Sequence, residues 1–171
     1  SRASGGARLE DLANGSWRVR WPLPDPIPRV SVVMVTRDRI DLLQPAVESL
    51  LAKTSYSNYE LLIVDHGSEE PQALSFLSQM EAEHDCIRVL RADGEFNWAR
   101  LNNIGAAAAR GEVFVFVNND IVVEESDWLT ELAGQSMRPD VGAVGACLLY
   151  TNGKVQHAGV VLGMTGVAGH I

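Results

Sequence analysis

The segment Gly111-Glu112-Val113-Phe114-Val115-Phe116-Val117-Asn118-Asn119-Asp120 decides the fold, because a run of β-forming residues is followed at once by polar ones. An apolar run with no polar face is typical of an inner strand of a largely parallel sheet. In open α/β sheets, ligands bind in the crevice outside the carboxyl ends of the strands. The segment therefore predicts a buried strand over residues 113–117 and a ligand-binding side chain at Asp120.

Two earlier segments end in the same way. Residues 30–35 run into Thr36-Arg37-Asp38, and residues 60–64 run into Asp65-His66-Gly67-Ser68. The carboxyl ends of parallel strands share one edge of a sheet. Asp38, Asp65 and Asp120 are therefore expected to converge at that edge.

Helical patterns alternate with these strands. Apolar residues recur at helical spacing over about 41–52, from Pro71 through Met80, and over about 98–109, and a further helix is expected after Ser126. A short additional strand is expected over residues 87–90, and Asp41 is the expected N-cap of the first helix. Strands that alternate with helices require crossover connections. The sequence thus predicts an α/β, Rossmann-like fold with a mostly parallel sheet flanked by helices.

The two ends of the chain have other patterns. Residues 1–29 end in a proline-rich stretch and are expected to be an extended lead-in. Residues 141–150 and 155–163 flank Thr151-Asn152-Gly153-Lys154, where Asn-Gly predicts a C-terminal β-hairpin. The last residues show no terminating element, so residues 30–171 are expected to be the N-terminal part of a truncated domain.

The composition limits the classes of function. A chain of 171 residues with 46% hydrophobic content fits one soluble globular domain. Its formal charge of −8 opposes nucleic-acid binding, and no apolar run approaches the ~20 residues that span a bilayer. Cys86 and Cys147 match no metal-ligand spacing, so reduced thiols and a cytoplasmic location are expected.

Several segments together resemble the family 2 glycosyltransferases of the A-type, nucleotide-sugar-binding fold, particularly bacterial enzymes that build rhamnan or O-antigen-type polysaccharides. The resemblance covers about residues 17–171, and it depends on the order and spacing of the segments. These are PRVSVVMVTRDR (28–39), YELLIVDHGS (59–68), FNWARLNNIG (96–105), VNND (117–120) and VQHAGVVLG (155–163).

The resemblance implies a nucleotide site at the carboxyl edge of the sheet. Thr36 and Asp38 would border the base and ribose, and Asp65 would accept a hydrogen bond from the imide N–H of uracil or thymine. An arginine at position 37 could reach a phosphate. The other nucleotide-binding residues implied are Asn103, Asn118 and Asn119.

The resemblance also implies a metal and a reaction. Asp120 would bind Mg²⁺ or Mn²⁺ that bridges the diphosphate, with Asn118 at the first position of the family's Asp-X-Asp, and His157 would lie near the donor sugar. The reaction implied is an inverting transfer from a nucleoside-diphosphate sugar, of the UDP or dTDP type, to a saccharide or lipid-linked acceptor in surface polysaccharide synthesis. The general base is expected after Ile171, and the full-length protein is expected in the cytoplasm, at the inner face of the membrane.

Other interpretations stay open at this point. A sugar nucleotidyltransferase should show a glycine-rich phosphate loop after the first strand, whereas Arg37-Asp38-Arg39 offers cations without glycines. A non-catalytic module that binds a nucleotide or carbohydrate would need no general base. In purely structural terms, Asp65 could form an Asx turn, Asn102 could bridge backbone groups, and Phe96 and Trp98 could belong to the core.

Overall fold

The computed structural model describes residues 6–12, 15–162 and 168–170. The chain divides into two compact units, residues 23–133 and residues 1–22 together with 134–171. The division falls within helix α4 (Trp128–Ser136).

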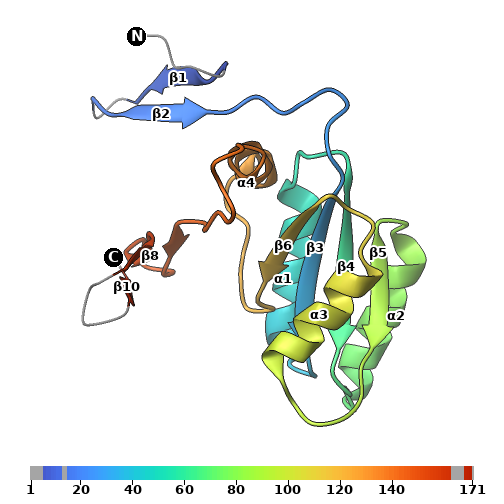
Figure 1. The fold of residues 1–171 in the computed structure, drawn as a ribbon. Helices are drawn as coiled ribbons and strands as arrows, with labels where there is room; N and C mark the ends of the chain where they lie inside the picture. The colour runs from blue at the N-terminus through green and yellow to red at the C-terminus, as the bar shows by residue number, and fades with distance from the viewer. Residues whose placement is uncertain (1–5, 13–14, 163–167, 171) are drawn as a thin grey trace. The chain divides into compact units, whose positions relative to one another are not determined.

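The unit of residues 23–133 is a parallel sheet covered by helices on both faces (Figure 1). The strand order is β5-β4-β3-β6, every pair is parallel, α3 lies on one face, and α1 and α2 lie on the other. This arrangement confirms the predicted fold class. In chain order the elements are β3 (Val30–Thr36), α1 (Ile40–Lys53), β4 (Tyr59–Asp65), α2 (Pro71–Glu83), β5 (Ile87–Arg91), α3 (Trp98–Ala108), β6 (Val113–Val117) and the start of α4.

Strand β3 lies at the centre of this unit, and all of its residues are buried. On one face, Val32 packs into a core shared with α1 and α2, and on the other Val33 packs beneath α3. Helix α3 approaches closely at Gly105, where an added Cβ would lie 2.4 Å from Val33 Cγ1. A side chain at position 105 would therefore push the helix off the sheet.

The strand order creates a switch point between β3 and β6. The chain moves from β3 to β4 and β5 in one direction and then returns to β6 on the other side of β3. The register sets Thr36 opposite Asp65, Asp65 opposite Arg91, and Met34 opposite Val117. The strands thus end together, at the type of place where open α/β sheets bind ligands.

The prediction that β6 is buried on both faces was wrong. Phe114 and Phe116 are 45% and 52% exposed, whereas Val115 packs against the core. Among the described strands β6 pairs only with β3, and the main contacts of α3 are with β3 and β4. An apolar run specifies a strand, but the coverage of its faces depends on which helix lies above it.

The predicted N-cap of α1 was also wrong. The helix begins at Ile40, and its N-cap is Arg39, whose backbone is left-handed (φ 49°) and whose side chain makes no capping bond. Asp41 lies in the first turn and accepts hydrogen bonds from the Arg39 side chain at 2.8 and 2.7 Å. The chain thus enters α1 through a left-handed residue, and the preceding carboxylate, Asp38, accepts hydrogen bonds from the backbone of Glu69 and Glu70.

The other unit contains short antiparallel pairs. Strands β1 (Arg8–Asp11) and β2 (Trp17–Arg20) pair within the segment predicted to be the lead-in. Strands β7 (Leu148–Leu149) and β8 (Val155–His157) form the predicted hairpin, with shorter strands and Gly153 at φ 78° in its turn. Strands β9 (Val160–Leu162) and β10 (Ala168–His170) also pair, and the expectation of a truncated domain stays a prediction.

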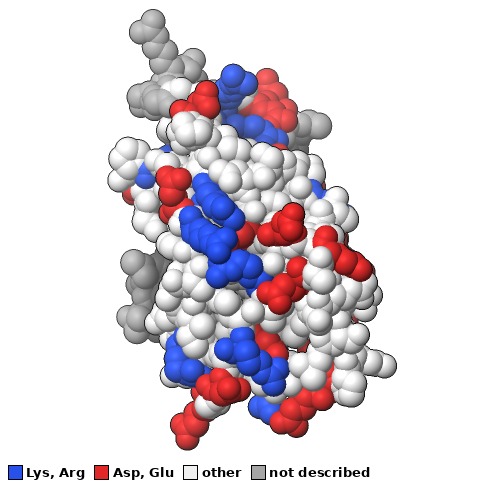
Figure 2. Space-filling model, turned by 90° about the vertical axis from the view of Figure 1, so that its right-hand side faces the viewer, with Lys and Arg blue, Asp and Glu red and all other residues white. Residues whose placement is uncertain are grey.

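Positive and negative side chains lie close together on one face of the molecule (Figure 2). On the face shown in Figure 2, Lys and Arg side chains form short clusters bordered by Asp and Glu. None of the described helices has the length and apolar character to cross a bilayer.

Glu60 forms a buried polar cluster at the amino edge of the sheet. Its side chain is 1% exposed, and its Oε1 accepts hydrogen bonds from Ser31 Oγ (2.7 Å) and the Arg110 N–H (2.6 Å). Its Oε2 lies 3.3 Å from Arg88 Nη1 and 3.7 Å from Arg29 Nη2. Burial alone would raise the pKa of Glu60, but these hydrogen bonds and positive charges outweigh it and hold the pKa below its usual value.

We expect Glu60→Gln to lower the free energy of unfolding by about 3 kcal/mol at neutral pH, because it leaves two arginines beside a neutral group. The folded-state pKa is depressed, so this stabilisation is complete above the unfolded pKa of about 4.3 and is lost as the pH falls through the folded value. Urea unfolding across pH 3–7 measures both effects.

Glu83→Gln is the matched control, since Glu83 is exposed at the end of α2. An unfolding free energy of Glu60→Gln equal to that of the control would show that the cluster does not stabilise the fold.

Candidate functional site

The loops that follow the strands interlock at the carboxyl edge. Thr36 ends β3 and is buried, and its carbonyl accepts a hydrogen bond from the His66 N–H at 2.8 Å. Its Oγ1 accepts a hydrogen bond from Asn119 Nδ2 at 3.1 Å. Two predicted nucleotide-binding residues, Thr36 and Asn119, are therefore in contact across the switch point.

Asp38 connects the loop after β3 to the start of α2. Its Oδ1 accepts hydrogen bonds from the backbone N–H groups of Glu69 (2.7 Å) and Glu70 (2.8 Å). Its own N–H donates to Ser68 Oγ at 2.7 Å, and its backbone is left-handed (φ 50°). The hydrogen bond from Glu70 is the main cause that lowers the pKa of Asp38. The carboxylate caps the beginning of α2.

Asp65 is held by protein donors on both oxygens. Oδ1 accepts a hydrogen bond from the Ser68 N–H at 2.9 Å, and Oδ2 pairs with Arg91 Nη1. Arg91 Nη2 also donates to the Ser68 carbonyl at 2.9 Å. The Asp65 side chain is 2% exposed and that of Arg91 is 47% exposed. Asp65 fixes the arginine, and the arginine is the accessible member of the pair.

Arg91 and Ser68 were not among the predicted site residues. The signal for Arg91 was in the sequence, because the short strand β5 ends in a cation beside a strand that ends in an acid. The last residues of two neighbouring parallel strands lie side by side when the strands end at the same register position. Asp65 and Arg91 are register partners at the ends of β4 and β5, so their side chains can pair.

Asn118 and Asp120 lie at the turn after β6, and both are exposed. In the part of the chain that the structure describes, no group of three or more His, Cys, Asp or Glu side chains is arranged to hold a metal ion. One carboxylate and neighbouring amide oxygens suit a divalent cation only where a ligand supplies further oxygens. Asn103 lies exposed on α3, and Arg37 is exposed at the end of β3.

The loop between β5 and α3 borders the same edge. His66 is buried, and its Nδ1 donates to the Ala92 carbonyl at 3.1 Å. The ring of Phe96 lies 5.8 Å from that of His66, centroid to centroid. Phe96 is 68% exposed and Trp98 is 45% exposed, so the assignment of these two aromatics to the core was wrong.

Asn102 does bridge the backbone, as its structural interpretation predicted. It is buried, and its Nδ2 donates to the Trp98 carbonyl at 2.9 Å within α3.

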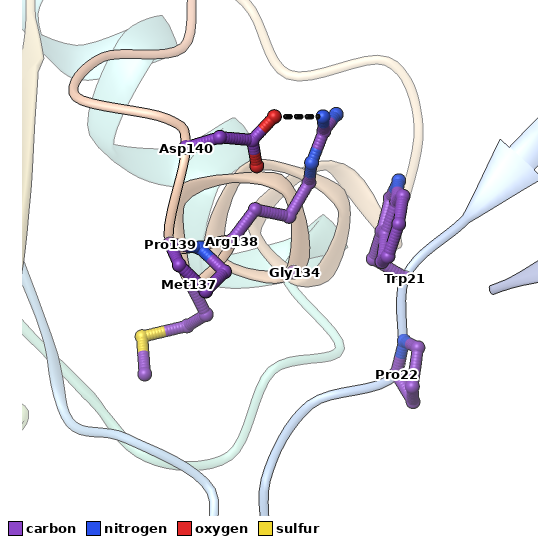
Figure 3. Close-up of a pocket in the computed structure, with 7 residues that line it drawn as sticks. All are labelled: Trp21, Pro22, Gly134, Met137, Arg138, Pro139 and Asp140. Carbon is purple, nitrogen blue, oxygen red and sulfur yellow. Dashed lines mark hydrogen bonds and ion pairs between the residues drawn. The ribbon is translucent and has the colours of Figure 1, made fainter. Parts of the chain in front are cut away.

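The remaining candidate and a pocket belong to the other compact unit. His157 is the last residue of β8, and its predicted contact with the donor sugar stays a prediction. The pocket has a volume of about 290 Å³ and none of the predicted site residues lines it (Figure 3). The Cζ atom of Arg138 lies 4.7 Å from the centroid of the Trp21 ring, and its Nη2 lies 2.8 Å from Asp140 Oδ2.

Comparison with known proteins agrees with this geometry. A mannosyltransferase of Pyrobaculum calidifontis, solved in complex with GDP-Man and Mn²⁺, aligns with 76% of this chain and 39% of its own, at a TM-score of 0.64 and 24% identity. This likeness shows that the chain has the A-type glycosyltransferase fold. The model of glycosyl transferase family 2 matches residues 31–163, and the chain belongs to this family.

Two curated relatives are considerably longer than this chain. The protein y4gI of Sinorhizobium fredii is 46% identical over 155 residues, which are 91% of this chain and 17% of that protein. The O-antigen biosynthesis protein RfbC of Myxococcus xanthus is 43% identical over 170 residues, which are 99% of this chain and 13% of that protein. The chain thus spans less than a fifth of either relative.

We expect three substitutions at Asp38 to separate its two structural roles. Asparagine keeps an acceptor and tolerates a left-handed backbone, glycine keeps only the backbone freedom, and alanine keeps neither. Thermal unfolding should therefore rank the variants, with Asp38→Asn nearest the unmodified protein, Asp38→Gly lower and Asp38→Ala lowest. Equal melting temperatures for the asparagine and alanine variants would contradict both the capping role and the backbone strain.

Proposed function

We propose that this chain binds the nucleoside-diphosphate sugar donor of an inverting glycosyltransferase that acts in surface polysaccharide synthesis. The observation that carries the proposal is the convergence of Thr36, Asp38, Asp65, Arg91 and Asn119 at the carboxyl edge of a family 2 chain. The identity with an O-antigen biosynthesis protein supports the polysaccharide as the product class.

A uracil or thymine base is the proposed partner of the Asp65 region. Both carboxylate oxygens of Asp65 already accept protein hydrogen bonds and the side chain is 2% exposed, so a base N–H would have to reach the second lone pair of one of these oxygens. The exposed guanidinium of Arg91 can donate to a base carbonyl while Asp65 holds it in place. The mannosyltransferase complex contains GDP-Man, which makes guanine the competing base.

Arg37, Asn103 and Asn118 are the proposed contacts to the rest of the nucleotide. All three side chains are exposed, so a ligand can reach them without a change in the fold. Arg37 is the candidate for a phosphate contact, because it is an exposed cation that directly follows β3 in the sequence.

Asp120 is the proposed ligand of Mg²⁺ or Mn²⁺. The Mn²⁺ in the mannosyltransferase complex supports a divalent ion in this fold. When bound, such an ion would neutralise charge on the diphosphate leaving group. Asp120 and the nearby amides would hold one side of it, and the donor's phosphate oxygens would hold the other.

For the acceptor we propose only the chemical class, which is a saccharide or a lipid-linked compound. An inverting transfer needs a general base at a saccharide or lipid-linked hydroxyl, and the predicted position of that base, after Ile171, lies outside the described residues. The contact of His157 with the donor sugar and a cytoplasmic location at the membrane's inner face likewise stay predictions.

Calorimetric titration with UDP, dTDP, GDP and ADP in the presence of Mn²⁺ tests the proposed donor. We expect UDP or dTDP to bind ~10-fold to 100-fold more tightly than ADP, which corresponds to one or two charge-assisted hydrogen bonds to the base. Equal affinity for all four nucleotides would exclude base recognition at Asp65 and Arg91, and absence of binding would exclude the donor site.

We expect Asp120→Ala to abolish the gain in UDP affinity that Mn²⁺ provides, with no loss of stability, because Asp120 is exposed. The same titrations with and without Mn²⁺ measure the gain. Glu125→Ala is the matched control, an exposed acid a few residues further along the chain. If Mn²⁺ does not change the UDP affinity of the unmodified protein, the metal assignment is wrong.

A further inference from the structure

Phe96 is the most exposed large apolar side chain whose environment the structure describes, at 68%. Burying a phenylalanine side chain stabilises a protein relative to leaving the side chain exposed. The fold does not take up this stabilisation at Phe96, although it does so at Phe76 of α2. The exposed ring is therefore accessible to a ligand.

The position of Phe96 is at the proposed nucleotide edge. Its ring lies 5.8 Å from the His66 ring, with 53° between the ring planes. His66 directly follows Asp65, its N–H donates to the Thr36 carbonyl, and its Nδ1 donates to the Ala92 carbonyl. His66 thus connects Phe96 to the ends of β3, β4 and β5.

The loop that carries Phe96 is braced by its own contacts. Arg100 Nη2 donates to the carbonyls of Asp93 (2.9 Å) and Glu95 (3.1 Å). The Asn97 side chain accepts a hydrogen bond from the Arg100 N–H at 2.9 Å and caps α3. These bonds fix the backbone on both sides of Phe96, so the ring is presented to solvent from an ordered loop.

We propose that Phe96 provides the stacking surface for the nucleobase of the bound nucleoside diphosphate; this inference rests on the proposed function. A flat apolar ring held at the edge of a nucleotide site matches the π-face that every base offers. The polar groups of the neighbouring Asp65 and Arg91 select among bases, whereas Phe96 contributes affinity to all of them. The ring of His66 supports Phe96 from the protein side.

The test compares Phe96→Ala and Phe96→Trp with the unmodified protein by calorimetry. The probes are UDP, GDP and inorganic pyrophosphate, each with Mn²⁺. Phe96→Ala should weaken both nucleotides by ~10-fold to 100-fold and leave pyrophosphate unchanged, since pyrophosphate has no base to stack. Phe96→Trp should retain or raise nucleotide affinity.

Phe114→Ala is the matched control, because Phe114 is also exposed (45%) but lies opposite Ser31, toward the amino end of β6. It should change no affinity. Equal nucleotide binding by Phe96→Ala and the unmodified protein would overturn the stacking role and leave the proposed function standing. Equal weakening of pyrophosphate and nucleotides would also overturn it, by showing a general loss of the site. If the unmodified protein binds neither nucleotide, both the inference and the proposed function fail.

Discussion

The pairing of β3 with β4 on one side and β6 on the other is the constraint on which the rest of the structure depends. Because β3 is buried on both faces and bonded along both edges, its register fixes where its neighbours end. Thr36 then meets Asp65 on one side and Asn119 on the other. The strand register therefore determines which residues lie together at the candidate site. The loops contribute further side chains at the positions where the strands end.

A buried carboxylate is paired with arginine at each of the two edges of the sheet. At the amino edge Glu60 is nearly inaccessible and is surrounded by Ser31, Arg29 and Arg88. At the carboxyl edge Asp65 is equally inaccessible, but its partner Arg91 keeps about half of its side chain in solvent. At the amino edge Glu60 is paired with two arginines that are 39% and 29% exposed, and at the carboxyl edge Asp65 holds one arginine that is 47% exposed beside the candidate site.

The sequence allowed the parallel sheet and the acids at its carboxyl edge to be predicted, because apolar runs and the residues that end them are local signals. It did not predict that Asp38 caps α2 while Arg39 precedes α1, since that choice depends on the distance between two loops in space. The exposure of Phe96 and Phe116 was missed for a related reason. An aromatic residue in a sequence favours a core position, but its burial depends on whether another helix or strand covers it.

Ser68 has a further consequence through its two roles. Its hydroxyl accepts a hydrogen bond from the Asp38 N–H, while its own N–H donates to Asp65. The first bond joins the loop after β3 to the loop after β4, and the second joins the end of β4 to the loop that follows it. Opening of the loop after β3 therefore exposes the Asp38 amide proton to exchange with deuterium while the Ser68 amide stays bonded to Asp65, so the exchange rate of Asp38 reports how often this side of the candidate site opens.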